Sequence, residues 1–231
     1  MNTHALAWIL ALFPLGCISY ILVTYALVLV ERPRTVPLAV TGRAALTELF
    51  VTLTLLPFWP LWMLFGAAYD RARDGERAGE RRPIVLLHGF LLTQTSWLVL
   101  GHRLARRGLG PIYGTTYFSL QPVRTSAEHL ALFVDEVRAR SGAERVDIVA
   151  HSMGGVVARY YLERLGGAAR VGRLITIASP HGGTRMGRWG LAAGARDLAI
   201  GSPLLAELPP PVTAAPYTSI WSRSDSIVIP Q

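Results

Sequence analysis

The residues best suited to chemistry are Ala-His-Ser-Met-Gly-Gly at 150–155, which lie between an apolar run and a helical pattern. The run at 146–150 is rich in β-branched residues, which is typical of a buried strand. A serine on a sharp turn between strand and helix presents its hydroxyl above the sheet edge, and small neighbours relieve the crowding. This pattern predicts that Ser152 is a nucleophile and that helix N–H groups are available to an oxyanion beside it.

Two further loops accompany this motif. His-Gly-Phe at 88–90 and Ser-Pro-His-Gly-Gly-Thr at 179–184 each follow an apolar strand pattern. The three loops together resemble the α/β-hydrolase lipases, and most of all the small bacterial triacylglycerol lipase group, which tolerates Ala at the first elbow position. The resemblance runs from Pro83 to the end of the chain. It implies an α/β-hydrolase fold and a serine hydrolase that cleaves acyl esters of lipids through an acyl-enzyme.

The resemblance also implies roles for residues around Ser152. Phe90 and Met153 match the two positions whose backbone N–H groups bind the oxyanion in this family. No metal and no organic cofactor is implied. Four neighbouring residues are expected to support the elbow and the oxyanion loop: His88, Gly89, His151 and Gly154.

Asp225 is the candidate for the catalytic acid. It follows a strand expected at 217–221 and precedes Ser-Ile-Val-Ile-Pro, which resembles the acid loop of the family. An acid there fixes the tautomer of the catalytic histidine and stabilises its imidazolium form. The alternative is a turn aspartate that caps local N–H groups. We favour the acid.

The catalytic histidine is the gap in this set. The family order is Ser, Asp, His, yet no histidine follows Asp225. His181 lies on a suitable loop, but the family does not use that position as the base, so it is a distant alternative. The simpler interpretation is truncation at the C-terminus, with the histidine loop and the last strand lying beyond Gln231.

The remainder of the chain after Pro83 alternates between strand and helix patterns. This alternation predicts an α/β fold with a doubly wound, mostly parallel sheet. The apolar residues after Thr184 fit either a lid over acyl chains or a surface helix packed on the sheet. The expected strands lie at 83–87, 112–118, 146–150, 171–178 and 217–221, and the expected helices at 96–107, from the capping box Thr125-x-x-Glu128 to Ser141, and from the elbow to Leu165.

Two uncharged runs precede this domain. Ala5–Val30 is long enough to cross a bilayer as a helix, and Leu49–Tyr69 is a second such run, interrupted by Pro57 and Pro60. We predict two transmembrane helices, with a re-entrant or interfacial hairpin as the alternative for the second run. The expected organisation is a membrane anchor at 1–70, a charged linker at 71–82 and a hydrolase domain at 83–231.

Composition limits the partners. The chain is 51% hydrophobic with a net charge of +8, and its 23 basic residues, all arginine, are scattered without a nucleic-acid motif. We therefore expect no nucleic-acid partner. The single Cys17 excludes an intrachain disulfide. The expected partners are a lipid or acyl-ester substrate and a membrane, most simply the bacterial cell membrane. The sequence does not decide on which side of the membrane the hydrolase domain lies, because arginines lie beside both runs. It does not decide the oligomeric state either.

Other functions fit the same residues. A thioesterase, an acyltransferase or a deacylase of lipid-linked glycans would use the same serine on the same fold. A hydrolase-like membrane protein that has lost its base would keep the fold without the catalysis. Substrate profiling with acyl esters and acyl-CoA separates the first group, and covalent labelling of Ser152 separates the second.

Overall fold

The computed structural model describes residues 3–31, 37–55, 81–208, 215–223 and 225–228. The chain divides into two compact units: one combines Met1–Leu61 with Ser222–Gln231, and the other is Trp62–Trp221. The larger unit contains the whole sheet. Most of the predicted linker at 71–82 lies outside the described residues, so the predicted domain boundaries stay predictions.

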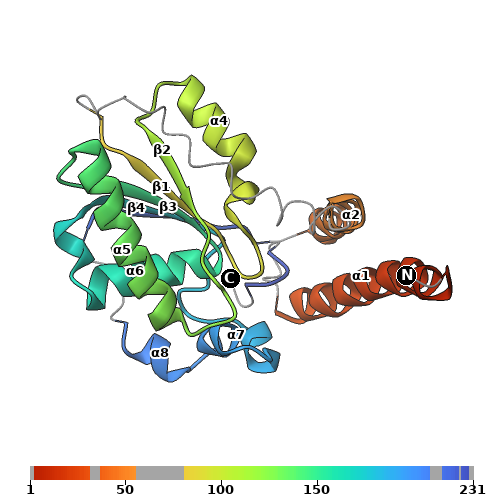
Figure 1. The fold of residues 1–231 in the computed structure, drawn as a ribbon. Helices are drawn as coiled ribbons and strands as arrows, with labels where there is room; N and C mark the ends of the chain where they lie inside the picture. Colours follow the sequence, from red (N-terminus) through yellow and green to blue (C-terminus); the bar gives the residue numbers. More distant parts are fainter. Residues whose placement is uncertain (1–2, 32–36, 56–80, 209–214, 224, 229–231) are drawn as a thin grey trace. The chain divides into compact units, whose positions relative to one another are not determined.

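A single parallel sheet forms the centre of the larger unit (Figure 1). Its strand order is β2-β1-β3-β4-β5, which confirms the predicted doubly wound α/β architecture. The chain leaves β1 toward β2 and then returns to the other side of β1 as β3. The carboxyl ends of β1 and β3 therefore form the switch point at which open α/β sheets bind ligands. The strands are β1 (Ile84–Leu87), β2 (Ile112–Thr115), β3 (Val146–His151), β4 (Val171–Ile177) and β5 (Tyr217–Ile220).

Helices cover both faces of this sheet (Figure 1). Side chains of successive strand residues point to opposite faces. Val85 and Leu87 therefore pack with α5 (Val123–Ser141) and α6 (Met153–Arg164), whereas Leu86 packs with Trp97 on the opposite face. That second face is covered by the short 3₁₀ helix η3 (Gln94–Trp97) and by α4 (Leu98–Arg106).

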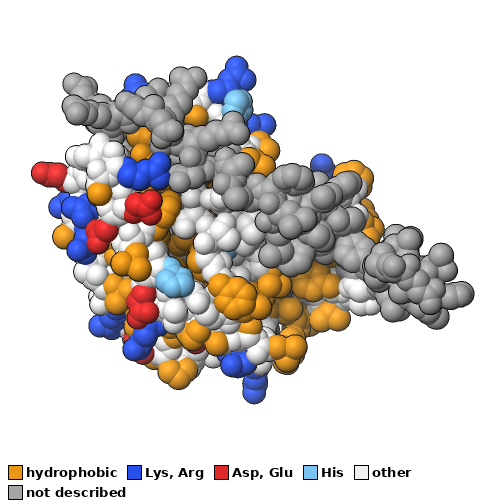
Figure 2. Space-filling view, viewed as in Figure 1, with side chains coloured by type: hydrophobic (Ala, Val, Ile, Leu, Met, Phe, Trp, Pro, Cys, Tyr) orange, Lys and Arg blue, Asp and Glu red, His pale blue; other side chains and the backbone are white. Residues whose placement is uncertain are grey.

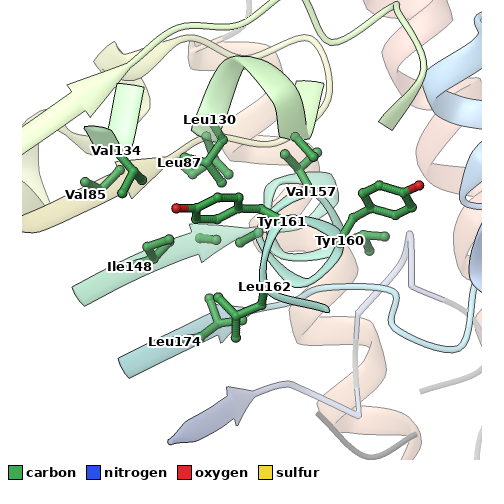
Figure 3. Packing of buried hydrophobic residues seen from close by; sticks show 14 of the residues in the cluster. Val85, Leu87, Leu130, Val134, Ile148, Val157, Tyr160, Tyr161, Leu162 and Leu174 are labelled. Carbon is green, nitrogen blue, oxygen red and sulfur yellow. The ribbon is translucent and has the colours of Figure 1, made fainter. Parts of the chain in front are cut away.

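Figure 3 shows the larger core on the α5 and α6 side of the sheet. Leu130 and Val134 of α5 lie beside Leu87 and Val85 of β1, and Tyr161 of α6 lies below them. Leu130, Val134 and Val137 are buried, as their helical spacing predicts. This core fixes α6, and with it the turn that carries Ser152.

The start of α5 differs from its prediction. The helix begins at Val123, so Thr125 and Glu128 lie inside it and form no capping box. The N–H of Val123 donates instead to Asp197 Oδ2 at 2.8 Å. A carboxylate 74 residues away in the chain thus caps the helix, which local sequence could not indicate. The end of α5 at Ser141–Gly142 is as predicted.

The segment after Thr184 fits each of its two predicted alternatives in part. It forms η5 (Arg185–Trp189), α7 (Ala193–Asp197) and α8 (Pro203–Ala206). A further short helix, η4 (Gly167–Ala169), lies earlier in the chain, just before β4. Leu198, Leu204 and Leu208 are buried in the core with α5 and α6, as a packed surface helix requires. Trp189 and Leu191 are exposed and belong to no core cluster.

The N-terminal unit contains α1 (Thr3–Glu31) and α2 (Leu38–Leu55). Ile21, Tyr25 and Val28 of α1 pack against Ala44, Ala45 and Leu49 of α2. The Tyr25 hydroxyl also donates to Glu48 Oε2 at 2.9 Å. The two helices therefore pair through an apolar seam and one polar contact.

The prediction of two transmembrane helices is not supported. Within the part of the chain that the structure describes, no helix is both long and apolar enough to span a membrane. The second predicted run was placed at Leu49–Tyr69, but α2 begins earlier and so includes Arg43 and Glu48. Residues 56–69 of that run lie outside the described residues.

Candidate active site

Ser152 lies on the turn between β3 and α6, as its sequence predicts. Its backbone has φ 52° and ψ −125°, a conformation that non-glycine residues rarely adopt. Its N–H donates to Ile177 O of the neighbouring strand at 2.9 Å. The surrounding sheet and helix thus impose the conformation, which costs about 1–3 kcal/mol locally. The turn holds the hydroxyl at the carboxyl end of β3.

Backbone strain is concentrated at this edge of the sheet. Among the described residues, three non-glycine residues have positive φ: Leu91 at 55°, Ser152 at 52° and Ala178 at 49°. Each follows the carboxyl end of a strand, respectively β1, β3 and β4. Strained residues persist where the surrounding structure overdetermines them, and they cluster at functional sites. The edge at the switch point is therefore the candidate active site.

Glycine at two positions lets the loops around Ser152 approach one another. A Cβ on Gly89 would lie 3.0 Å from Ser152 Cβ and 3.0 Å from His151 Nδ1. A Cβ on Gly154 would collide with the carbonyl oxygen of His88. The loop after β1 therefore packs directly beside the serine and the first turn of α6.

The peptide between Gly89 and Phe90 is held in a fixed orientation. The Gly89 carbonyl accepts a hydrogen bond from His88 Nδ1 at 2.7 Å and another from the Leu92 N–H at 3.3 Å. Because the C=O and N–H of a planar trans peptide point in opposite directions, these bonds also fix the direction of the Phe90 N–H.

The two predicted oxyanion donors are not used elsewhere. Within the described part of the chain, neither the Phe90 N–H nor the Met153 N–H donates a hydrogen bond. Met153 is the first residue of α6, where N–H groups have no acceptor inside the helix. The arrangement leaves two backbone donors on the two loops that meet at Ser152. Their role as an oxyanion hole stays a prediction.

His88 is braced by Tyr117, a residue that the sequence analysis missed. The Tyr117 N–H donates to His88 Nε2 at 3.2 Å, and the Tyr117 hydroxyl donates to His88 O at 2.9 Å. The two rings stack with their centroids 4.4 Å apart. Both ring nitrogens of His88 are therefore engaged. Burial lowers its pKa to about 4, so the ring is neutral near pH 7.

Two more residues after β2 hold the loop after β1. Ser119 Oγ accepts from the Leu91 N–H at 2.8 Å, and Thr116 Oγ1 accepts from the Gln94 N–H at 3.1 Å. The strand predicted at 112–118 ends at Thr115 because the following residues turn to make these bonds. Polar and aromatic side chains at the end of an apolar run were the one sequence signal for this brace.

His181 does not take the position of a base. Its Nε2 lies 3.1 Å from Thr176 Oγ1, and its backbone oxygen accepts from Arg159 Nη1 at 3.2 Å. Burial, and then the nearby Arg159 charge, lower its pKa to about 4. These contacts run to β4 and α6, so the alternative of His181 as base gains no support.

The other histidines with described side chains are also engaged elsewhere or exposed. His102 and His129 are exposed on α4 and α5, and the ring of His151 lies edge-on to Trp97 with centroids 6.4 Å apart. None of the residues described in the structure forms a hydrogen bond with the Ser152 hydroxyl. Nor do they include a group of three or more His, Cys, Asp or Glu that could hold a metal ion.

Asp225 caps a local turn in the N-terminal unit. Its Oδ1 accepts from the N–H groups of Ile227 and Val228, both at 2.9 Å. The adjacent Ser226 hydroxyl donates to Glu48 Oε1 of α2 at 2.5 Å. These contacts match the alternative of a turn aspartate, although its Oδ2 takes part in neither bond. The catalytic role of Asp225 stays a prediction.

The fold and the geometry of this edge define an α/β-hydrolase. Residues 84–226 match the model of the alpha/beta hydrolase family. The chain therefore belongs to the α/β-hydrolase family, which confirms the resemblance drawn from its three loops.

Solved lipases share the fold. The chain is similar to Aspergillus fumigatus lipase B, with 18% identity over 70% of this chain and 42% of that one, at a TM-score of 0.61. It is also similar to the mature form of a Bacillus licheniformis lipase, with 16% identity over 64% of this chain and 67% of that one, at a TM-score of 0.53. The chain spans 32% of the propeptide form of the same bacterial lipase. The TM-scores show a likeness of fold.

Proposed function

We propose that this protein is a serine hydrolase that cleaves acyl esters of lipids through an acyl-enzyme. One observation carries the proposal: Gly89 lies against Ser152, and the adjacent Phe90 N–H, like the Met153 N–H, donates to no other described residue. Donors placed in advance where negative charge develops supply the largest stabilisation in acyl transfer. The lipid substrate is supported by the lipase fold of the neighbours and by the family resemblance.

The reaction follows from this geometry. Ser152 Oγ attacks the ester carbonyl carbon, and its proton passes to an acceptor while the carbonyl oxygen becomes an oxyanion held by Phe90 and Met153. The C–O bond to the alcohol breaks, the alcohol leaves with a proton, and the acyl group stays on Ser152. Water then attacks the acyl-enzyme and releases the carboxylic acid. We propose that Asp225 orients the histidine that accepts the proton.

The test supplies the proton acceptor from solution. None of the described histidines is bonded to Ser152, so added imidazole should raise hydrolysis of p-nitrophenyl esters by this chain. Imidazole also cleaves such esters unaided, so the Ser152→Ala variant at the same imidazole concentration is the control. We expect an imidazole-dependent rate at least tenfold above that control, and covalent fluorophosphonate labelling of the parent chain alone.

The acyl group then decides between the related chemistries. Esters of long acyl chains should react faster than acetyl esters, and acyl-CoA should react more slowly than either. Turnover of acyl-CoA without turnover of oxyesters would replace the lipase assignment with a thioesterase. Identical rates for the parent and Ser152→Ala, with neither protein labelled and both folded by circular dichroism, would support a non-catalytic module.

A further inference from the structure

The loop after β2 turns alternate side chains inward and outward at the carboxyl edge of the sheet. Tyr117 and Ser119 are buried, whereas Phe118 is 64% exposed and Leu120 is 37% exposed. Figure 2 shows hydrophobic side chains gathered over the region of this loop and α7. The two inward residues contact the loop after β1, which carries the proposed oxyanion donor Phe90. They are therefore placed to act on that donor.

The partners of His88 define which of its ring nitrogens carries the proton. Nδ1 lies 2.7 Å from the Gly89 carbonyl oxygen, which can only accept a hydrogen bond. Nε2 lies 3.2 Å from the Tyr117 backbone nitrogen, whose N–H can only donate. The neutral ring consequently carries its proton on Nδ1 and a lone pair on Nε2. In the other tautomer, the Nε2–H would face the Tyr117 N–H, and no proton would lie between Nδ1 and the Gly89 oxygen.

The tautomer of His88 controls the peptide that carries the Phe90 N–H. An Nδ1 without a proton repels the Gly89 oxygen, so the bond at 2.7 Å forms only in the Nδ1–H tautomer. The other bond to this oxygen comes from the Leu92 N–H and is longer, at 3.3 Å. Loss of the His88 bond would therefore leave the peptide between Gly89 and Phe90 with one weak restraint on its orientation.

The side chain of Tyr117 holds His88 against the Tyr117 N–H. The two rings stack with their centroids 4.4 Å apart and their planes 12° apart. The Tyr117 hydroxyl donates to His88 O at 2.9 Å. Burial raises the pKa of this hydroxyl, so it stays protonated and remains a donor. One residue thus holds both the ring and the backbone of His88.

The loop that carries Tyr117 is itself held by α7. The Gly194 N–H of α7 donates to Leu120 O at 3.3 Å. A Cβ on Gly194 would lie 2.5 Å from Ser119 O and 2.6 Å from Gln121 O, so α7 packs directly on this loop. The backbone next to Tyr117 is therefore fixed by contacts of its own.

We propose that Tyr117 is a positioning residue of the oxyanion hole. It selects the Nδ1–H tautomer of His88 and thereby fixes the direction of the Phe90 N–H. This role rests on the proposed function, because it requires an oxyanion to form beside Ser152. Tyr117 acts through His88 and not on the reacting atoms.

The first measurement reads the tautomer without any reaction. The full chain, with isotopically labelled histidine, gives a long-range proton–nitrogen correlation spectrum at neutral pH. The signals of His88 are identified by their absence in His88→Asn. We expect a proton on Nδ1 and none on Nε2. A folded parent chain with the proton on Nε2 would overturn the proposal, because the Tyr117 N–H would then have no acceptor on that ring.

The second measurement compares two buried tyrosines. Tyr117→Leu keeps the backbone N–H but loses the ring stack and the hydroxyl that hold His88 against it. We expect both tautomers of His88 in this variant. Fluorophosphonate labelling of Ser152 should slow about tenfold, because small displacements of oxyanion donors are costly.

Tyr113→Leu is the matched control for that change. Tyr113 is also buried, on β2, but its ring faces Arg140 and not His88. This variant should lose stability in urea titrations without changing the tautomer or the labelling rate. Equal slowing in Tyr113→Leu and Tyr117→Leu, with both proteins folded by circular dichroism, would show that loss of packing in general is responsible.

Two substitutions of His88 separate its two ring bonds. Asparagine places an amide N–H near the position of Nδ1 and can donate to Gly89 O. Glutamine reaches the position of Nε2 and can accept from the Tyr117 N–H. We expect His88→Asn to slow labelling about fivefold and His88→Gln about fifty-fold, because the bond to Gly89 O is the one that directs the Phe90 N–H. The reverse order would contradict the proposal.

Failure of the hydrolase proposal would give a different result. A folded parent chain in which Ser152 is never labelled would overturn the hydrolase, and with it this role of Tyr117. Normal labelling of the parent chain, with an unchanged rate in Tyr117→Leu, would overturn the role of Tyr117 alone.

Discussion

At the scale of single residues, the candidate site depends on glycines, which have no Cβ, as much as on the side chains around it. Gly89 and Gly154 carry no Cβ, and this lets the loop after β1 lie against the elbow. Ser152 and Leu91 hold positive φ values that most side chains avoid. The serine and the donors around it are consequently set by backbone geometry before any substrate binds.

Replacing Gly89 by alanine tests this close approach. The new Cβ would lie 3.0 Å from Ser152 Cβ and 3.0 Å from His151 Nδ1, so the loop or the elbow would have to shift by a few tenths of an ångström. We expect fluorophosphonate labelling of Ser152 to slow at least tenfold, because small displacements of oxyanion donors are costly.

Gly182→Ala is the matched control for that change. Gly182 lies on the loop after β4 at the same sheet edge, and a Cβ there would meet nothing within 4 Å. Its labelling rate should equal that of the parent chain. Equal slowing in both variants would mean that alanine acts through the loops in general and not through contact with Ser152.

At the scale of elements, side chains from distant segments hold the loops that surround the site. Tyr117 and Ser119, which follow β2, bind His88 and Leu91, which follow β1. Asp197 of α7 binds the start of α5 in the same manner. The elements at the carboxyl edge are therefore coupled through side chain to backbone bonds across the fold.

The N-terminal cap of α5 gives a prediction at this scale. Asp197→Ala removes the acceptor of the Val123 N–H and should lower the free energy of unfolding by about 1 kcal/mol. Thr125→Ala should change it by less than about 0.5 kcal/mol, since Thr125 caps nothing. Urea titrations followed by circular dichroism measure both values. A larger loss for Thr125→Ala than for Asp197→Ala would contradict this account and support the predicted capping box.

At the scale of the whole molecule, two histidines with lowered pKa values link stability to pH. Burial lowers the pKa of His88 and His181 from 6.5 to about 4. Between these values the unfolded chain binds protons that the folded chain does not. The contribution of these two histidines to the free energy of unfolding is therefore fully present above about pH 6.5 and is lost as pH drops toward 4.

The slope of this fall is a further expected result. Each of these two histidines contributes about 1.4 kcal/mol per pH unit within the window. Partial burial raises the pKa values of Asp147 and Asp197, so the folded state binds their protons first and they act in the opposite direction at lower pH. For that reason the test compares variants and not the total curve.

His181→Gln should flatten the pH dependence relative to the parent chain, whereas His102→Gln, at an exposed position on α4, should leave it unchanged. Urea titrations at pH 7, 5.5 and 4.5 (values chosen to cover the window set by an ordinary histidine pKa of about 6.5) measure both. Parallel curves for the parent chain and His181→Gln would show that His181 does not titrate with folding.

The sequence by itself determined the features that depend on local patterns. The alternation of apolar runs and helical spacing gave the parallel α/β architecture, and the small residues around Ser152 gave the turn between strand and helix. Three short loops in order identified the family. These features are readable because strand, helix and tight turn each impose residue types on their own few positions.

Tertiary structure alone decided the features that depend on residues distant in the chain. The brace from Tyr117 and Ser119 and the cap from Asp197 each join a side chain to a backbone group that lies far away in the sequence. The start of α2 at Leu38, which brings Arg43 and Glu48 into that helix, overrode the hydropathy of the second apolar run. Hydrogen bonds and burial depend on which residues are neighbours in space, whereas the sequence shows only which residues are neighbours along the chain.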